Sequence, residues 1–211
     1  MMDKKELEIM APAGNFECLQ AAIQGGADSV YFGVGKLNMR SHSANNFAPE
    51  DLQKVVEICR KAGVKSYLTL NICLYPEDIE DAREALLAAK QAGVSAVIAS
   101  DMAAILMCRE IGLEVHISTQ LSISNAQALK FYAQWADVVV LARELNLGQV
   151  KHIRDYRAGA DQGSFRPIGP HRDVRPRCLV YGYQRKMLFE SARLRGIGQS
   201  GSVLSDMPSR L

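Results

Sequence analysis

The sequence predicts an α/β protein, an incomplete TIM-type (β/α) barrel of six β-α units followed by an irregular tail. Three observations favour this fold. Short runs rich in Val, Ile, Leu and Tyr alternate with amphipathic segments up to residue 155. The runs are nearly continuous in apolar residues, as in parallel strands covered on both faces. No GxGxxG or GxxxxGKS/T motif follows the first run, so we favour a barrel over a doubly wound nucleotide-binding sheet.

The β-α units follow one another in order along residues 1–155. The six predicted strands are short and apolar, and they lie at residues 6–12, 29–35, 66–72, 95–100, 114–119 and 137–143. Apolar residues three and four positions apart predict helices within residues 16–24, 49–62, 76–92, 101–111, 124–135 and 146–155. Because a closed barrel of this type has eight strands, the first and sixth strands would keep free edges.

Local signals mark the ends of these helices. Four helices are followed by a glycine that suits a left-handed C-cap, namely Gly26, Gly63, Gly93 and Gly112. Pro49 and Pro76 precede acidic residues in the first turns of the second and third helices. Ser124 or Asn125 can cap the fifth helix. The same module is therefore repeated along the chain.

Composition divides the chain near residue 156. Residues 1–155 contain 15 Lys and Arg against 19 Asp and Glu, whereas residues 156–211 contain 10 against 4. In the second region Arg and Pro interrupt every apolar run before it reaches strand or helix length. We therefore predict a partial barrel over residues 1–155 and a disordered tail over residues 156–211. A basic arm that binds nucleic acid is the alternative interpretation of the tail.

Composition also restricts the class of protein. No apolar run approaches the roughly 18 residues of a membrane span, and the N-terminal segment carries acidic residues where a signal peptide is apolar. The five cysteines have no CxxC or paired spacing, which is typical of reduced thiols. We therefore expect a cytoplasmic protein without a membrane partner. The four histidines lack ligand spacing, so we expect no metal site in this chain.

Polar side chains follow the predicted strands where an active site of this fold would lie. The carboxyl ends of barrel strands meet at one rim, and residues there contact ligands. The candidate ligand-binding residues are Asn38, Arg40, Asn71, Ser118, Gln120, Asn125, Arg143 and Glu144. Arginines would hold an anionic group, while amides would fix its orientation.

Several of these positions also have structural interpretations. Asp101 can cap the helix that follows it, Ser118 can satisfy backbone groups at a strand end, and Glu144 can neutralise Arg143. Two nucleophiles are conceivable, but neither has a convincing base. Cys73 has no histidine nearby in sequence, and His116 lies two residues before Ser118, which favours a core role for the histidine. The catalytic residues therefore stay unknown.

Four blocks resemble a known family: ELEIMAPAGNFECLQAAIQGGADSVYFG, LNMRSHSANNF, STQLSISN and VVLARELNLGQVKHIR. Together they are similar to the peptidase U32 family of collagenase-like proteases over residues 6–155. The resemblance implies a peptidase, or a protein of prephenate-linked tRNA or rRNA hydroxylation. Its substrate would then be a peptide or an RNA. Members of this family are usually at least about twice as long as this chain.

The tail contains a family block in another reading frame. Residues 171–191 can be encoded by a nucleotide sequence that, read one base later, gives IEMFVHGALCMAISGKCYLS, which resembles the seventh strand of the family. When the shifted frame is continued to residue 210, it permits further cysteines like those of the family. The two shifted segments together then contain four cysteines. We therefore interpret residues 156–211 as a frameshift product. The resemblance implies an iron-sulfur or other metal site in a full-length relative, but no cofactor in this chain.

The leading hypothesis is a truncated U32 peptidase that is inactive as written. The alternative is a fragment of an RNA hydroxylation protein. A third hypothesis, of another class, is a non-enzymatic nucleic-acid-binding protein with a basic tail. Open barrel edges would promote aggregation.

Overall fold

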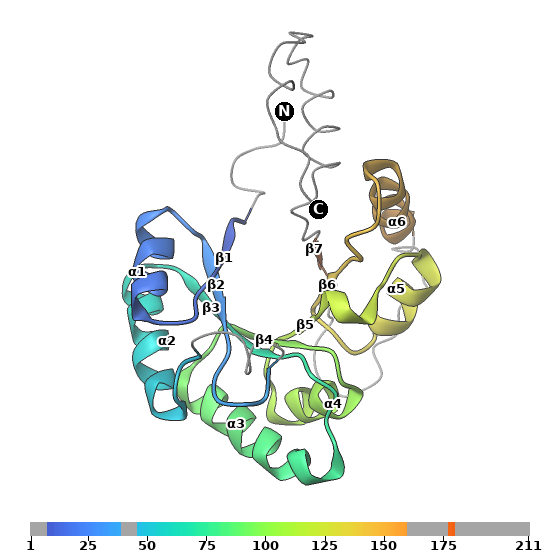
Figure 1. Cartoon of the computed structure of the whole chain (residues 1–211). Coiled ribbons are helices and arrows are strands. Elements are labelled where there is room, and N and C mark those ends of the chain that lie inside the picture. The colour runs from blue at the N-terminus through green and yellow to red at the C-terminus, as the bar shows by residue number, and fades with distance from the viewer. Residues whose placement is uncertain (1–7, 39–45, 160–176, 180–211) are drawn as a thin grey trace, which may run out of the picture.

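The computed structural model describes residues 8–38, 46–159 and 177–179. Seven parallel strands form one sheet in chain order (Figure 1): β1 Met10–Pro12, β2 Ser29–Phe32, β3 Lys65–Leu70, β4 Ala96–Ala99, β5 Val115–Ile117, β6 Val138–Val140 and β7 Arg177–Leu179. The helices are α1 Phe16–Gln24, α2 Leu52–Lys61, α3 Ile79–Ala92, α4 Met102–Ile111, α5 Ala126–Tyr132 and α6 Leu147–Gly159. This order confirms the incomplete (β/α) barrel.

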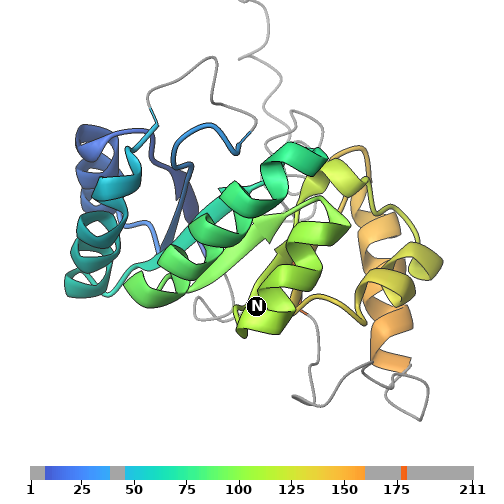
Figure 2. The ribbon, with the colours of Figure 1, turned by 90° about the horizontal axis from the view of Figure 1, so that it is seen from below.

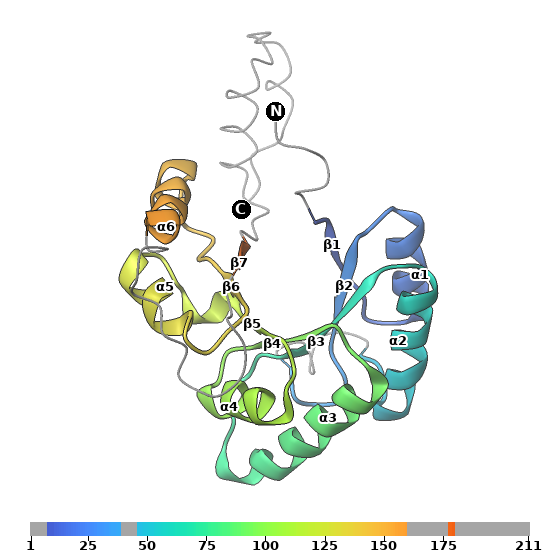
Figure 3. The same cartoon turned by 180° about the vertical axis from the view of Figure 1, so that it is seen from behind.

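The sheet curves into an arc that does not close. Within the described residues β1 pairs only with β2, and the strands run in order to β7 at the other edge. The helices cover the convex side of the arc, which Figures 2 and 3 show from below and from behind. The concave side corresponds to the interior of a complete barrel.

One strand departs from the prediction. The sequence analysis places free edges on the first and sixth strands, but the outer edge of β6 is paired, with Val138 opposite Arg177 and Val140 opposite Leu179. The predicted free edge at β6 is therefore wrong. The physical reason is that an open parallel edge presents unpaired backbone N–H and C=O groups, which even a three-residue segment can satisfy.

The two faces of the strands alternate as a period of two requires. On the outer face Phe32, Leu70 and Ile117 pack with helix residues such as Leu86 and Ile105 in the main core. On the inner face Tyr67, Ala96 and Ile98 form a separate small cluster, against which Met10 and Tyr31 pack. The main core therefore lies between the sheet and the helices, and it does not depend on closure of the barrel.

Helix ends follow the local signals of the sequence. The four predicted glycines all have a positive φ, 80° at Gly26, 70° at Gly63, 81° at Gly93 and 77° at Gly112. Of the two candidate caps of α5, Asn125 caps the helix, since its Oδ1 accepts from the backbone N–H of Ala128 at 2.9 Å. These turns place each following strand back in the sheet.

Candidate functional site

The loop after β2 holds a buried amide at the rim. Asn38 is 2% exposed, and its Nδ2 donates to the carbonyl oxygen of Gly35 at 3.3 Å. Gly33 lies directly beneath it, because a Cβ atom there would come within 2.4 Å of Asn38 Nδ2. The glycine therefore makes room for the amide. Arg40 lies outside the described residues, so its predicted role stays a prediction.

Asp101 joins the loops after β3 and β4. Its Oδ1 accepts from the N–H of Ala103 at 2.8 Å, which caps α4, and its Oδ2 accepts from the N–H of Leu74 at 3.1 Å. The structural interpretation of Asp101 is therefore confirmed. Asn71 follows β3 directly and is half-buried, whereas Cys73 is exposed two residues later.

The loop after β5 brings Ser118 and Gln120 together. Ser118 is 3% exposed, and its Oγ accepts from the backbone N–H of Gln120 at 3.4 Å. The side chain of Gln120 is exposed at the rim. His116 does not serve Ser118 as a base, since its Nε2 lies 3.0 Å from Oε1 of Glu114. The core role predicted for His116 agrees with its 2% exposure.

Arg143 and Glu144 are both exposed after β6. Among the ion pairs of the described residues none joins these two side chains. The interpretation that Glu144 only neutralises Arg143 is therefore not supported. Both stay candidate ligand contacts at the rim.

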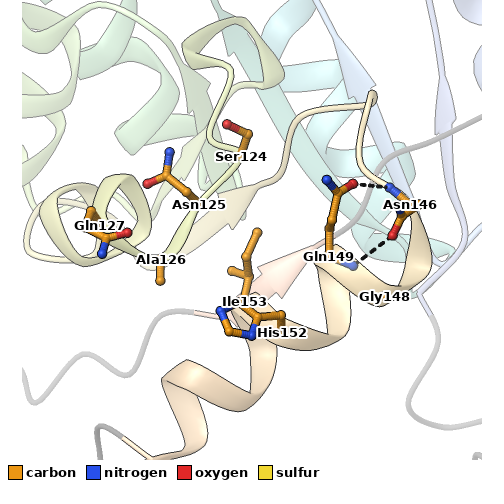
Figure 4. Close-up of a pocket in the computed structure, with 9 residues that line it drawn as sticks. All are labelled: Ser124, Asn125, Ala126, Gln127, Asn146, Gly148, Gln149, His152 and Ile153. Atoms are coloured by element: carbon orange, nitrogen blue, oxygen red, sulfur yellow. Dashed lines mark hydrogen bonds between the residues drawn. The ribbon is translucent and has the colours of Figure 1, made fainter.

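A pocket of about 530 Å³ opens between the first turns of α5 and α6 (Figure 4). Its lining comprises Ser124, Asn125, Ala126, Gln127, Asn146, Gly148, Gln149, His152 and Ile153. Of these only Asn125 was a predicted site residue. Sequence reasoning considered Ser124 only as an alternative helix cap and did not single out the others, because their proximity depends on how α5 and α6 pack. Asn146 and Gln149 cap α6 through reciprocal 2.9 Å hydrogen bonds.

A polar network lies on the inner face of the sheet, towards the amino ends of the strands. Glu8 accepts from Lys65 Nζ and from the hydroxyl of Tyr67, both at 2.6 Å. Burial raises the pKa of Glu8, but these hydrogen bonds outweigh it and hold the pKa below its ordinary value. The ring of Tyr67 in turn lies 4.7 Å from that of His116. Sequence reasoning did not foresee this network.

Two of the cysteines are structural. Burial raises the pKa of Cys59 to about 11 and that of Cys108 to about 12, so both stay protonated thiols near neutral pH. Within the described part of the chain no group of three or more His, Cys, Asp and Glu side chains could hold a metal ion. No helix in that part is both long and apolar enough to span a membrane.

Residues 14–161 match the family model of peptidase family U32. The chain belongs to this family. A "Collagenase" of Porphyromonas gingivalis is 60% identical over 154 residues, which are 73% of this chain and 37% of that protein. The "tRNA hydroxylation protein P1" of Bacillus subtilis is 38% identical over 154 residues, or 72% of this chain and 36% of that protein. The chain thus spans little more than a third of these U32 relatives.

A solved structure supports the fold. The U32 peptidase Mk0906 superposes with a TM-score of 0.62 at 15% identity, over 96% of this chain and 85% of that one. At this identity the likeness concerns the fold alone. This chain therefore shares the fold of that protein over most of its length.

Proposed function

We propose that this chain is the amino-terminal barrel portion of a collagenase-like U32 peptidase and that its rim binds the backbone of a peptide substrate. The observation that carries the proposal is the chemistry of the rim. Asn71 directly follows β3 and Gln120 lies in the loop after β5, so uncharged side chains that can both donate and accept stand at the carboxyl ends of two strands on either side of β4. Such groups match the alternating N–H and C=O groups of a peptide. The 60% identity to a protein named collagenase supports the same ligand class.

RNA is the second candidate substrate, favoured by the 38% identity to a tRNA hydroxylation protein. RNA binding draws on cationic side chains that neutralise phosphates. Residues 1–155 have an excess of acidic side chains, 19 against 15 basic ones. Arg143 is the rim candidate with a cationic side chain among the described residues. This charge balance favours peptide over RNA for this part of the protein.

Binding measurements on the full chain test the choice. We expect a fluorescent gelatin peptide to bind, and we expect Asn71→Ala with Gln120→Ala to weaken it about tenfold, since two hydrogen-bonding groups are lost. Gln91→Ala is the matched control, because Gln91 is an exposed amide at the far end of α3. Tight binding of tRNA that weakens steeply with salt, without peptide binding, would instead support the RNA candidate or a basic nucleic-acid-binding arm.

We propose further that residues 156–211 are translated out of frame. The U32 match ends at residue 161, close to the change in composition. The shifted reading of residues 171–191 supports the same interpretation. Sequencing of the coding DNA should find a one-base insertion or deletion near codon 155. Related genes that encode the same Arg-rich tail in an uninterrupted frame would contradict this interpretation.

The restored frame would supply four cysteines that the present chain lacks. Soft thiolates select iron-sulfur clusters or zinc, so we expect the frame-restored protein, prepared without oxygen, to retain such a metal. Elemental analysis of the frame-restored protein and of the present chain measures the metal content of each. A restored chain whose cysteines all titrate as ordinary thiols, without metal, would remove the metal hypothesis.

A further inference from the structure

We propose that the open edge of β1 is a docking surface for one strand–helix unit that a separate polypeptide, the remaining part of a U32 protein, can supply. The clearest sign is a contrast in burial among the strands. No residue of β1 is buried, whereas every residue of β4, β5 and β6 is buried. β1 lies at one end of the arc, and among the described residues it pairs with β2 alone (Figure 1).

The backbone of β1 presents an edge that a further strand can pair with. On the β2 side, the carbonyl oxygen of Ile9 accepts from the first N–H of β2 at 3.1 Å, and the N–H of Ala13 donates to the carbonyl oxygen of Tyr31 at 3.0 Å. Alternate residues of a parallel strand bond to opposite neighbours, so the backbone groups of Met10 and Pro12 face the other edge. Because proline has no N–H, this edge offers one donor, from Met10, and two carbonyl oxygens.

Ile9 is the side chain that the helix of this unit would cover. It is 62% exposed, although it lies on the same face of the chain as Ala13, which belongs to the main core. On that face of β2, Val30 and Phe32 are 0% and 1% exposed. A right-handed β-α-β connection places each helix over its own strand and the next, so α1 covers the β2 side of β1. The opposite side of β1 needs the helix that follows β7 in barrel order, and the described part of the chain contains no such helix.

The barrel geometry sets the size and the chemistry of the partner. A closed barrel of this type has eight strands and seven are described, so one further parallel strand between β7 and β1 would close it. The helix of that unit would place an apolar side chain against Ile9. The collagenase relative is long enough to contain such a unit, because the matched residues are only 37% of that protein.

This inference rests on one part of the proposed function, namely that the chain is a portion of a U32 barrel. It does not involve the binding of peptide at the rim. Association with the partner is therefore measured without peptide, so that either proposal can fail while the other stands.

Coexpression tests the docking surface. The full chain is produced together with the part of the Porphyromonas gingivalis collagenase that follows its matched residues. We expect the two to copurify as an equimolar complex with a raised Tm, since a partner that binds only the folded state stabilises it. The amide of Met10 should exchange with solvent about tenfold more slowly in the complex than in the free chain. The absence of a complex, or unchanged exchange at Met10, would overturn the proposal.

Ile9→Lys separates the β1 edge from other contacts. A lysine there opposes strand pairing and removes the apolar contact, so we expect the affinity for the partner to fall about tenfold or more. Leu106→Lys is the matched control, because Leu106 is 40% exposed and belongs to α4 in the middle of the arc (Figure 1). The control should leave the affinity unchanged, and both variants should keep the Tm of the free chain.

The pattern of these losses decides which surface and which partner are involved. Equal losses in the two variants, or no loss in Ile9→Lys, would show that the partner does not dock at the β1 edge. Self-association of the chain alone that Ile9→Lys abolishes would identify a second copy as the occupant and overturn the choice of partner.

Discussion

The two faces of the sheet differ in chemistry although the same strands form both. The outer face is mainly apolar, and Phe32, Leu70 and Ile117 are each at most 1% exposed beneath the helices. The inner face carries polar groups as well, including Tyr67 and His116. The difference shows that packing against helices stabilises this fold, while the inner face and the rim are available for polar chemistry.

The largest effect should come from the outer face. Leu70→Ala removes a buried side chain and leaves a cavity between the sheet and the helices, so we expect it to lower the free energy of unfolding by about 3 kcal/mol. Leu87→Ala, at a side chain that is 44% exposed, should cost well under half as much. Denaturant titration of both variants makes the comparison. Equal losses would show that the outer face does not dominate stability.

An intermediate effect should come from the rim. Gly33→Ala places a Cβ against the buried amide of Asn38, so we expect a loss of about 2 kcal/mol. Asn38→Ala removes the atoms that would clash. In that background Gly33→Ala should cost much less, and a double-mutant cycle on unfolding measures the coupling. Additive losses would show that the close approach of these two residues does not explain the glycine.

The smallest effect should come from the inner network. Glu8→Gln removes the charge that pairs with Lys65, and at neutral pH we expect a loss of about 1 kcal/mol or less, since both side chains are partly exposed. Because the folded-state pKa of Glu8 is lowered, its contribution is present above the unfolded pKa and is lost as pH falls through the folded pKa. The two proteins should therefore become equally stable in acid.

Thermal melts across pH measure this convergence. Glu57→Gln is the control, since Glu57 pairs with Lys61 on the exposed surface of α2 and should show a much weaker dependence. A difference between Glu8→Gln and the unmodified chain that persists at low pH would mean that the network does not act through the charge of Glu8.

Sequence and structure agree most closely where the controlling interactions are local. Apolar periodicity predicted six strands and six helices at the observed places, because each element shows its own period within a few residues. The left-handed glycines and the cap at Asn125 follow from groups no more than four residues apart. These features required no knowledge of the neighbouring elements.

Tertiary structure decided the features that depend on distant residues. The sequence named Asn38 and Ser118 as rim residues, but only the fold shows that both are buried, and that Gly33 makes room for Asn38. The bond between Glu8 and Lys65 joins residues 57 positions apart, and the α5–α6 pocket needs two helices placed side by side. Strand register and helix packing set these contacts, and the chemistry of a single segment does not encode them.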